Sequence, residues 1–426
     1  MAGSIVLIAG CAGGEEASNT VGNNADLPQA SDEYSGGPVE LLVKDQNAAL
    51  TESEFEKIAR QVKVKYPDIS LKMTKDPIDT LLAAGTVPDL VTVSNPSLGT
   101  YLDIDYPEDL NPMIKRFKVD LNRIDPTVLE TLKQYGKDGG IYGIPFGMNY
   151  GAMVYNKDIF DKFGVPYPTD SITWEQFLDL SKRLTRMDGE VQYIGGTPDR
   201  IMNLLKQNGI SNMDAKDEKA ILTTEKHQYV FSYMKELFEI PGLVNDKVHL
   251  PTNVNSNTIA MKSNWIASFA AFFTKNPPEY DWDLTAYPVF KDKQTGNPVD
   301  FHMMTVSKTS KHKEAAYRVL LTMMSEEMQL ALSKSGRLSI LNDPNVKLTY
   351  ASDSKVFEGK NLKAVLSVPP SPLPDYSTWT PAVKPFIDSA LKDIAYNKSD
   401  INTALREAEE KANRKIEEER AMKGIK

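Results

Sequence analysis

The sequence predicts an α/β protein of two domains, and three observations support that prediction. The chain has 426 residues, which exceeds the length of one average domain. After Pro38, strand-like and helix-like patterns alternate, which is typical of parallel strands joined by crossover helices. Hydrophobic residues make up 41% of the chain and charged residues 25%, so each domain has enough apolar side chains for a core.

The N-terminal segment carries the lone cysteine, Cys11, so no internal disulfide can form. Cys11 follows the apolar run SIVLIAG and precedes a polar stretch, residues 12–37, that is too poor in apolar residues to pack. The sequence IAGC at residues 8–11 resembles a bacterial lipobox, in which the cysteine carries lipid. We therefore expect residues 1–37 to be a truncated lipoprotein signal, without its basic region, and a flexible tether. A stray cysteine in a disordered arm is the alternative.

The first domain begins with three predicted strands and two predicted helices. The strands are the runs VELLVKD, ISLKM and DLVTVSN, at residues 39–45, 69–73 and 89–95. Residues 51–68 have the apolar spacing of a helix, with Thr51 or Ser53 as its cap, and residues 77–85 predict a short helix. Since ligands bind beyond the carboxyl ends of parallel strands, the polar residues at two of these ends are site candidates. They are Asp45, Gln46, Asn47, Ser94 and Asn95.

A glycine-rich stretch follows at residues 139–157, GGIYGIPFGMNYGAMVYNK. Glycine recurs at every fourth position from Gly139 to Gly151, a spacing that is found where two membrane helices pack closely. Pro145 opposes a helix at this place. We therefore predict a turn, a short strand up to Pro145, and a second strand over residues 148–155.

The rest of the chain predicts a second set of helices and strands. Thr173 and Gln176 have the spacing of a capping box, which marks the start of a helix. Helical patterns cover residues 173–187, 197–209, 224–240, 313–336 and 399–423. Strand-like patterns cover residues 281–290 and 301–308, and residues 257–273 are compatible with a strand, a helix or both.

The sequence contains no concentrated signature of catalysis or metal binding. His227, His249, His302 and His312 lack the spacing of a zinc site, and no nucleophile-elbow or P-loop motif is present. The acidic run at residues 103–109 lacks the glycine and terminal glutamate of a calcium loop, and a solvated loop is the favoured interpretation. The net charge of −9 disfavours nucleic acid as a partner, and no apolar run has the length of a membrane span. We expect no catalytic residue, metal or cofactor, although the 58 acidic residues leave a glycosidase pair of carboxylates open.

Two of the four tryptophans are candidates for stacking on a sugar. Trp265 and Trp379 each follow a polar residue in a segment that otherwise has a buried pattern. Indole faces stack on the apolar C–H faces of sugar rings, while neighbouring amides and carboxylates bind the hydroxyls. A core position is the alternative for both, and it is the prediction for Trp174 and Trp282.

In several segments the chain closely resembles the extracellular solute-binding proteins of ATP-driven importers, in the branch that contains the sugar and oligosaccharide binders. The matching segments occur in the family's order and span nearly everything after Pro38. They are the lipobox at Cys11, GTVPDLVTVSN, residues 138–185, IAMKSNW, residues 301–329 and NTALREAEEKANRKIEE.

The resemblance implies a two-lobed periplasmic-binding-protein-like fold of type II, an α/β fold whose lobes are joined by crossing strands. The first crossing would follow Pro145 and the second would lie near residues 301–304. Gly147 and Gly151 would leave room in the first crossing for rotation and for a ligand. The N-terminal lobe would comprise residues 38–147 plus 303–338, and the C-terminal lobe residues 148–302 plus 339–426.

The resemblance also implies which residues contact a ligand in the cleft between the lobes. These are Asp45, Gln46, Ser94, Asn95, Asn149, Tyr150, Asp199, Trp265, His302, Tyr376 and Trp379. Pro96 stands where some maltodextrin binders have an aromatic residue, which weakens the stacking platform expected of the N-terminal lobe. Asp199 and His302 point to a charged ligand or to one other than a simple maltodextrin.

The function that the resemblance implies is binding without catalysis. The chain would be a lipid-anchored monomer on the extracellular face of a bacterial, Gram-positive cell membrane. It would capture a sugar or oligosaccharide by hinge closure and deliver it to the permease subunits of an ABC importer. Two alternatives remain, a surface-anchored enzyme that degrades polysaccharide and a structural or sensory lipoprotein that binds a partner protein.

Overall fold

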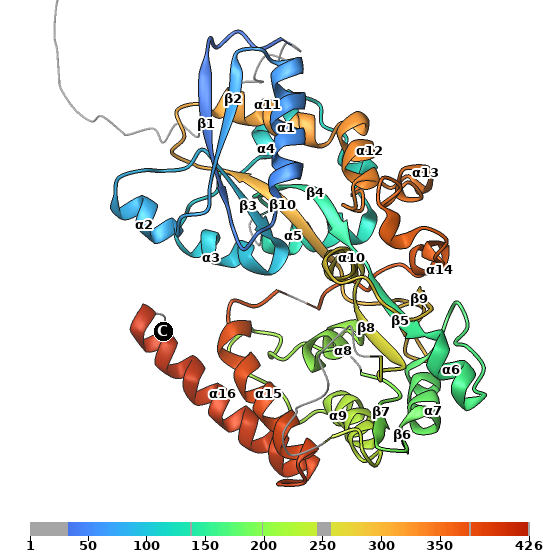
Figure 1. The fold of residues 1–426 in the computed structure, drawn as a ribbon. Helices are drawn as coiled ribbons and strands as arrows, with labels where there is room; N and C mark the ends of the chain where they lie inside the picture. Colours follow the sequence, from blue (N-terminus) through green and yellow to red (C-terminus); the bar gives the residue numbers. More distant parts are fainter. Residues whose placement is uncertain (1–32, 137–138, 198, 245–256, 375, 425–426) are drawn as a thin grey trace, which may run out of the picture.

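The computed structural model describes residues 33–136, 139–197, 199–244, 257–374 and 376–424. Within these ranges the chain forms two lobes, each with its own sheet, which confirms the predicted α/β class (Figure 1). One sheet has five strands in the order β2-β1-β3-β10-β4, and the other has three in the order β8-β5-β9. Cys11 and the lipobox-like sequence before it lie outside the described residues. No helix of the described ranges has both the length and the apolar character to cross a membrane.

The five-stranded sheet lies in the upper lobe of Figure 1 and contains the three strands predicted first along the chain. β1 (Val39–Asp45) pairs in parallel with β2 (Ile69–Thr74) and with β3 (Leu90–Ser94), as predicted. β10 (Asp300–Val306) and β4 (Ile144–Asn149) complete the sheet, and β10 is antiparallel to both of its neighbours. The carboxyl ends of β1 and β3 therefore lie at one edge of this lobe.

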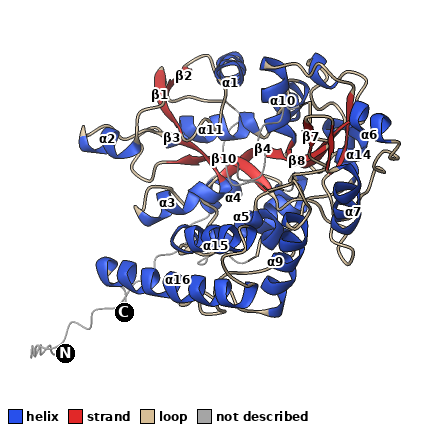
Figure 2. Cartoon of the chain, turned by 60° about the horizontal axis from the view of Figure 1, so that its bottom comes forward, coloured by secondary structure: helices blue, strands red, loops and turns tan. Residues whose placement is uncertain are grey.

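The helices of the upper lobe include both predicted connections between its parallel strands. α1 (Glu52–Lys65) begins at a capping box, in which Thr51 accepts from the Glu54 backbone N–H and the Glu54 carboxylate accepts from the Thr51 backbone N–H. Figure 2 shows the helices arranged around the strands. The remaining helical segments before β4 are α2 (Ile78–Ala83), η1 (Asn95–Ser97), α3 (Leu98–Asp103), α4 (Asn111–Arg116), η2 (Leu121–Arg123) and α5 (Pro126–Tyr135).

The lower lobe is built around the three-stranded sheet, with β5 (Gly151–Asn156) antiparallel to β8 (Met261–Trp265) and to β9 (Trp282–Ala286). A two-stranded ribbon pairs β6 (Arg186–Asp188) with β7 (Val191–Tyr193). Residues 257–273 therefore contain both a strand and a helix. The helices are α6 (Lys157–Phe163), α7 (Trp174–Leu184), α8 (Ile201–Gln207), α9 (Glu225–Phe238), α10 (Ile266–Lys275), α15 (Thr380–Ala395) and α16 (Ile401–Lys423).

The predicted helical pattern over residues 313–336 is confirmed, and the structure divides it into two helices, a break that the pattern did not indicate. α11 (Lys313–Met323) packs on the large sheet, and α12 (Glu326–Lys334) follows it directly. The hydroxyl of Ser325 accepts from the Met328 backbone N–H and caps the second helix, so the chain turns at this serine. After α12, short helices lead back to the lower lobe; they are α13 (Pro344–Lys347), η3 (Lys355–Phe357) and α14 (Leu362–Ser367).

The chain passes between the sheets at Tyr150, which alone separates β4 from β5. The predicted end of a strand at Pro145 is wrong, since β4 runs through it. β4 is an edge strand of the sheet. Its pairing with β10 also shifts register between His302 and Met303, beside Pro145. Proline, which has no backbone N–H, is tolerated both in edge strands and at such irregularities. The second crossing lies earlier than predicted, between Ala286 and Asp300, because β10 belongs to the large sheet along its whole length.

Other side chains already fill the space beside the two glycines of the first crossing, Gly147 and Gly151. A Cβ at Gly147 would lie 2.3 Å from Cδ of Arg337, and a Cβ at Gly151 would lie 2.5 Å from a ring carbon of Tyr287. The Gly151 N–H also donates to the side-chain oxygen of Asn297. Neighbouring side chains thus occupy the room that the sequence interpretation gave to rotation and to a ligand.

The described core consists of two clusters of buried apolar side chains, and β5 contributes to both. Ala152 and Val154 belong to the cluster that also fills the large sheet. Met153 and Tyr155 belong to the cluster of the lower lobe. Because successive side chains of a strand point to opposite faces, β5 is covered on both sides.

Candidate ligand-binding cleft

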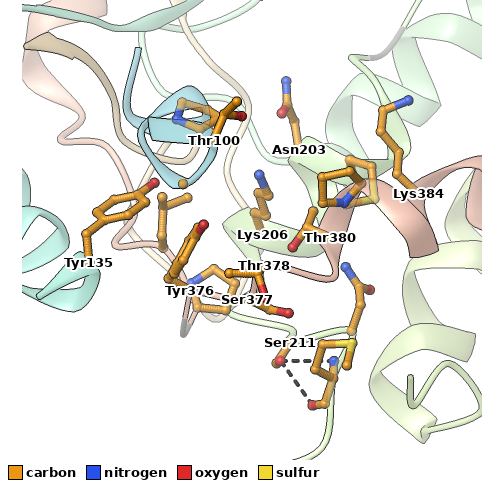
Figure 3. A pocket seen from close by; sticks show the side chains of 18 of the residues that line it. Thr100, Tyr135, Asn203, Lys206, Ser211, Tyr376, Ser377, Thr378, Thr380 and Lys384 are labelled. Atoms are coloured by element: carbon orange, nitrogen blue, oxygen red, sulfur yellow. Dashed lines mark hydrogen bonds between the residues drawn. The ribbon is translucent and has the colours of Figure 1, made fainter. Parts of the chain in front are cut away.

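A cavity of about 450 Å³ lies between the two lobes (Figure 3). The upper lobe contributes η1, α3 and the end of α5, with Thr100 and Tyr135 among the lining side chains. The lower lobe contributes α8, the segment that leads to α15, and the start of α15. The wall is mixed in character, because tyrosines and methionines alternate with hydroxyl, amide and cationic groups. A volume of this size is in the range of small-molecule sites.

Two tyrosines form the aromatic part of the wall. Tyr135, at the end of α5, and Tyr376, in the segment before α15, lie with ring centroids 4.4 Å apart and planes inclined by 44°. Burial raises the pKa of Tyr376 to about 12 and also raises that of Tyr135, so both hydroxyls stay protonated at neutral pH. The pair can therefore offer ring surface together with neutral hydroxyl groups.

Gly99 of α3 makes room for Tyr376. A Cβ at this glycine would lie only 1.7 Å from the Tyr376 hydroxyl oxygen. The backbone of α3 therefore approaches the tyrosine more closely than any other residue type at position 99 would allow. This contact joins the upper lobe to the segment that enters the lower one.

The charged side chains of the cavity are mostly cationic. Arg200, Lys206 and Lys384 come from the lower lobe, and Asp103 of α3 is the one acidic residue in the described wall. Asp103 pairs with Lys423 at the end of α16, with 3.6 Å between carboxylate and ammonium. Burial lowers the pKa of Lys206, although the carboxylate of Asp300 opposes that shift.

Polar side chains at the start of α8 support the wall from below. Asn203 donates from its side-chain amide to Asp199 at 2.7 Å, and the Tyr287 hydroxyl donates to the same carboxylate oxygen at 3.2 Å. Burial raises the pKa of Asp199, an effect that these donors only partly offset. Asp199 thus holds the side chain of Asn203 in place. Asn203 lines the cavity, whereas Asp199 does not.

The predicted loop residues after β1 and β3 hold the backbone of their own lobe. Asp45 accepts from the Leu50 backbone N–H at 3.1 Å and from the Thr92 hydroxyl at 2.8 Å. The side-chain oxygen of Gln46 accepts from the Tyr101 hydroxyl at 2.9 Å. A role of Asp45 and Gln46 in binding stays a prediction.

Ser94 and Asn95 lie closer to the cavity but face other groups. The Ser94 hydroxyl is 3.1 Å from that of Ser97, and the side chain of Asn95 bridges the backbone of Val299 and Phe301. Asn95 is 1% exposed, and its neighbour Pro96 lines the cavity in its place. These contacts explain the local structure and leave the binding role untested.

Asn149 and His302, two of the ligand contacts predicted at the crossings, make contacts within the protein. The side-chain oxygen of Asn149 accepts from the Ala267 backbone N–H at 3.3 Å, and its amide donates to Asp300 at 3.4 Å. Tyr150 is buried. A ring nitrogen of His302 contacts the Arg337 guanidinium, and burial together with that cation lowers the pKa of His302 to about 3. His302 is therefore neutral at physiological pH.

The tryptophans divide into core and non-core positions. Trp174 and Trp282 are 0% and 6% exposed, which confirms both as core residues. Trp379 is also 6% exposed, within the lower core, and the Lys423 ammonium lies 5.4 Å from its ring centroid. Trp265 is half-buried at the end of β8. Stacking of Trp265 and Trp379 on a ligand stays a prediction.

Among the predicted ligand contacts, Tyr376 lines the cavity. Most of the other residues that line it were not predicted from the sequence. Asn203 and Lys206 follow the predicted Asp199 by four and seven positions, so helical spacing was the signal that could have found them. Tyr135 gave no such signal, because it ends a helix whose apolar face is buried.

The structure gives no support to a metal at the acidic run. Among the described residues, no group of three or more histidine, cysteine, aspartate or glutamate side chains is placed to hold an ion. Asp105 pairs with Lys308 at 2.7 Å, and Glu108 pairs with Lys313 at 3.0 Å. The acidic side chains of this run are thus spread over separate ion pairs.

Comparison with known proteins gives matches at the level of both sequence and fold. A family model for the bacterial extracellular solute-binding proteins matches residues 53–356. An arabinooligosaccharide-binding protein from Bacillus subtilis (strain 168) is 26% identical over 216 residues, which are 47% of this chain and 47% of that protein. The alignment therefore spans about half the length of this curated relative.

Two solved structures share the fold. A substrate-binding protein of an ABC transporter from Listeria monocytogenes, in complex with cycloalternan, aligns with a TM-score of 0.71 and 20% identity, over 88% of this chain and 98% of that one. A sugar transporter protein from Rhizobium etli, in an open conformation, aligns with a TM-score of 0.70 and 19% identity, over 88% and 99%. The predicted two-lobed, type II fold is confirmed by these neighbours.

Proposed function

Because the chain belongs to the bacterial extracellular solute-binding proteins, we propose that it captures a sugar or oligosaccharide between its lobes and delivers it to an ABC importer. The observation that carries this proposal is the cavity of about 450 Å³, which both lobes line and in which Tyr135 and Tyr376 present paired rings. The names of the similar proteins agree with a saccharide, since they bind arabinooligosaccharide and cycloalternan.

The cavity has the two kinds of surface that a saccharide requires. The apolar C–H face of a sugar ring can lie against Tyr135 or Tyr376. Ser211, Thr378 and Asn203 lie nearby with polar groups that can bind its hydroxyls (Figure 3). A few fixed polar groups on a mainly apolar wall give a small-molecule site its orientation and specificity.

Hinge closure is the proposed response to ligand. A ligand that contacts Thr100 and Tyr135 on one side and Asn203 and Thr380 on the other has full contact only when the lobes are together. Such a ligand stabilises the closed form, because only a difference in affinity between two forms shifts their equilibrium. The protein itself performs no chemical step in this proposal.

The remaining parts of the proposal concern location and partners. Cys11 would carry lipid and residues 12–37 would tether the lobes to the extracellular face of the membrane, as the lipobox-like sequence suggests. The closed monomer would then dock on permease subunits. Metabolic labelling with a radioactive fatty acid tests the anchor, and Cys11→Ala should abolish the label.

The proposed function is tested by calorimetry and thermal shift with a panel of mono- and oligosaccharides. A ligand at a hundredfold excess over its dissociation constant should raise the free energy of unfolding by about 2.7 kcal/mol. Tyr376→Ala and Tyr135→Ala should each weaken binding by about 1–3 kcal/mol, on the scale of aromatic stacking on a ligand. Small-angle scattering should show a smaller radius of gyration with ligand.

A surface tyrosine provides the matched control. Tyr229 is 46% exposed on α9, outside the cavity, so Tyr229→Ala should leave affinity unchanged. Equal affinity of the wild type and both cavity variants, with the fold intact, would refute this site. New reducing ends from an oligosaccharide would instead favour a polysaccharide-degrading enzyme, and no ligand-dependent stabilisation at all would favour a lipoprotein that binds a partner protein.

A further inference from the structure

The wall of the cavity is cationic in a chain that is acidic as a whole. The chain carries a net charge of −9, yet the described residues of the wall include Arg200, Lys206 and Lys384, with Asp103 as the one acidic residue among them. A neutral saccharide requires no such excess of positive charge. The positive charge of the wall therefore indicates the charge of the ligand, which the tyrosines do not.

Two of these four charges are already compensated. Lys384 pairs with Asp388 one turn further along α15, and Asp103 pairs with Lys423. Within the part of the chain that the structure describes, neither the Lys206 ammonium nor the Arg200 guanidinium has a hydrogen bond or an ion pair. The unbalanced positive charge is thus concentrated on α8 and the residue before it.

Asp300 interacts electrostatically with Lys206 and Asp199 with Arg200, but both carboxyl groups also have other partners. Asp199 directs its carboxylate to the Arg200 backbone N–H, to Asn203 and to Tyr287. Asp300 is contacted by the side-chain amide of Asn149. Burial raises the pKa of both carboxyls, which favours their neutral forms.

Lys206 is half-buried and lines the cavity. It lies near the middle of the group in Figure 3, with Tyr135 and Tyr376 on one side and Thr380 and Lys384 on the other. Burial lowers its pKa, and the attraction of the Asp300 carboxylate only partly offsets that shift. An anionic ligand group would supply the missing partner, and a charge-assisted hydrogen bond of this kind is among the stronger polar contacts.

We propose that the cavity selects an anionic sugar, whose acidic group binds at Lys206 while its ring lies against Tyr135 and Tyr376. This inference rests on the proposed function of sugar capture and narrows it to one class of ligand. The acidic group is a uronate carboxylate or a sugar phosphate, since both offer the same charge and the same acceptor oxygens. Arg200, at the rim, would add attraction at longer range.

Pairs of sugars that differ only in the acidic group test the proposal. Three pairs separate the effect of charge from that of shape: glucuronate with glucose, galacturonate with galactose, and digalacturonate with the matching neutral disaccharide. Glucose 6-phosphate, compared with glucuronate, separates a phosphate ligand from a carboxylate ligand. In calorimetry at 50 mM NaCl, at least one acidic member should bind about tenfold or more tightly than its neutral twin. Raising NaCl to 500 mM should reduce that advantage.

Variants at two lysines identify the residue responsible. Lys206→Met should weaken binding of the acidic sugar by roughly tenfold to a hundredfold and weaken binding of the neutral twin much less. Lys411→Met is the matched control, because Lys411 is exposed on α16, where it pairs with Glu407, and should change neither affinity. Circular dichroism should confirm that both variants are folded.

The possible failures are distinct. If neutral sugars bind as tightly as their acidic twins and Lys206→Met has no selective effect, the inference is wrong and sugar capture stands. If the folded wild type binds neither member of any pair, nor the longer saccharides of the panel, the proposed function is wrong and the inference fails with it.

Discussion

Trp379 shows at the scale of one residue how a candidate for ligand stacking can be a core residue. Its ring packs with the lower core, and we expect Trp379→Ala to lower the free energy of unfolding by about 3–5 kcal/mol, the usual cost of removing a buried aromatic side chain. Urea denaturation measures that loss. Trp379→Phe is the control and should retain most of the stability. An unchanged unfolding midpoint with a large loss of affinity would instead assign the ring to the ligand.

Two histidines make stability depend on pH. Burial lowers the pKa of His227 to about 4, and burial with the Arg337 cation lowers that of His302 to about 3. Unfolded histidine titrates near 6.5, so the unfolded chain takes up protons first as the pH falls. Both histidines therefore contribute stability that is present above pH 6.5 and is lost below it, at up to about 1.4 kcal/mol per pH unit each.

Urea unfolding at half-unit steps from pH 7.5 to 5 measures this dependence. His227→Gln and His302→Gln should each reduce the slope of stability against pH between 6.5 and 5. Slopes equal to that of the wild type in both variants would mean that these histidines are not held neutral in the folded chain.

At the scale of residues, the sequence predicted burial better than it predicted partners. Trp174 and Trp282 were assigned to the core correctly, because polar neighbours and a helix start explained them without a ligand. The partners of His302 could not be predicted, since Arg337 lies 35 positions further along the chain. Only the fold brings such residues together.

At the scale of elements, the approach of α3 to the segment before α15 limits what can stand at position 99. In Gly99→Ala the new Cβ would lie 1.7 Å from the Tyr376 hydroxyl oxygen, so Tyr376 must move away from α3 and its packing against Tyr135 must change. We expect a loss of ligand affinity of about tenfold with little change in stability, because Gly99 lies in a helix where alanine is favourable.

A double variant tests that steric reason. In Gly99→Ala with Tyr376→Phe the hydroxyl is gone, and the nearest ring carbon lies 2.9 Å from the new Cβ, so affinity should recover in part. Calorimetric affinities of the two single variants and the double variant form a double-mutant cycle. Additive effects would show that the two residues do not interact.

Helix starts and the order of strands were predictable because their signals are local. The capping box at Thr173, the cap at Thr51 (predicted as Thr51 or Ser53) and the parallel pairing of the first three strands follow from short patterns. The break between α11 and α12 was missed because apolar spacing continues through Ser325, whose capping bond decides the geometry. Pro145 was misjudged because its tolerance depends on an edge position, which is a property of the finished sheet.

At the scale of the whole molecule, one ion pair beside the cavity connects the two lobes through the end of α16. The pair between Lys423 of α16 and Asp103 of α3 is half-exposed, and such pairs contribute at most about 1 kcal/mol. Figure 2 shows α15 and α16 side by side along one end of the molecule, and their contact brings Lys423 toward the other lobe. The resemblance implied two lobes with a cleft between them, but most of the side chains that line the cavity come from distant segments and could not be predicted.

The division of the chain into lobes at the predicted boundaries stays a proposal, because the two cores meet across the three-stranded sheet. Ile266 and Leu284, which follow the first crossing along the chain, pack in the core of the large sheet. The predicted lobe boundaries therefore follow the path of the chain, but they do not coincide with the division between the two cores.

The alternation of side chains along β5 has a consequence for how the protein melts. Val154 supports one core and Tyr155 supports the other, so neither core can lose its structure without removing half of the packing around the same strand. The lobes should therefore unfold together. Differential scanning calorimetry should record a single transition whose calorimetric and van't Hoff enthalpies agree, whereas two resolved peaks would mean that one lobe survives the loss of the other.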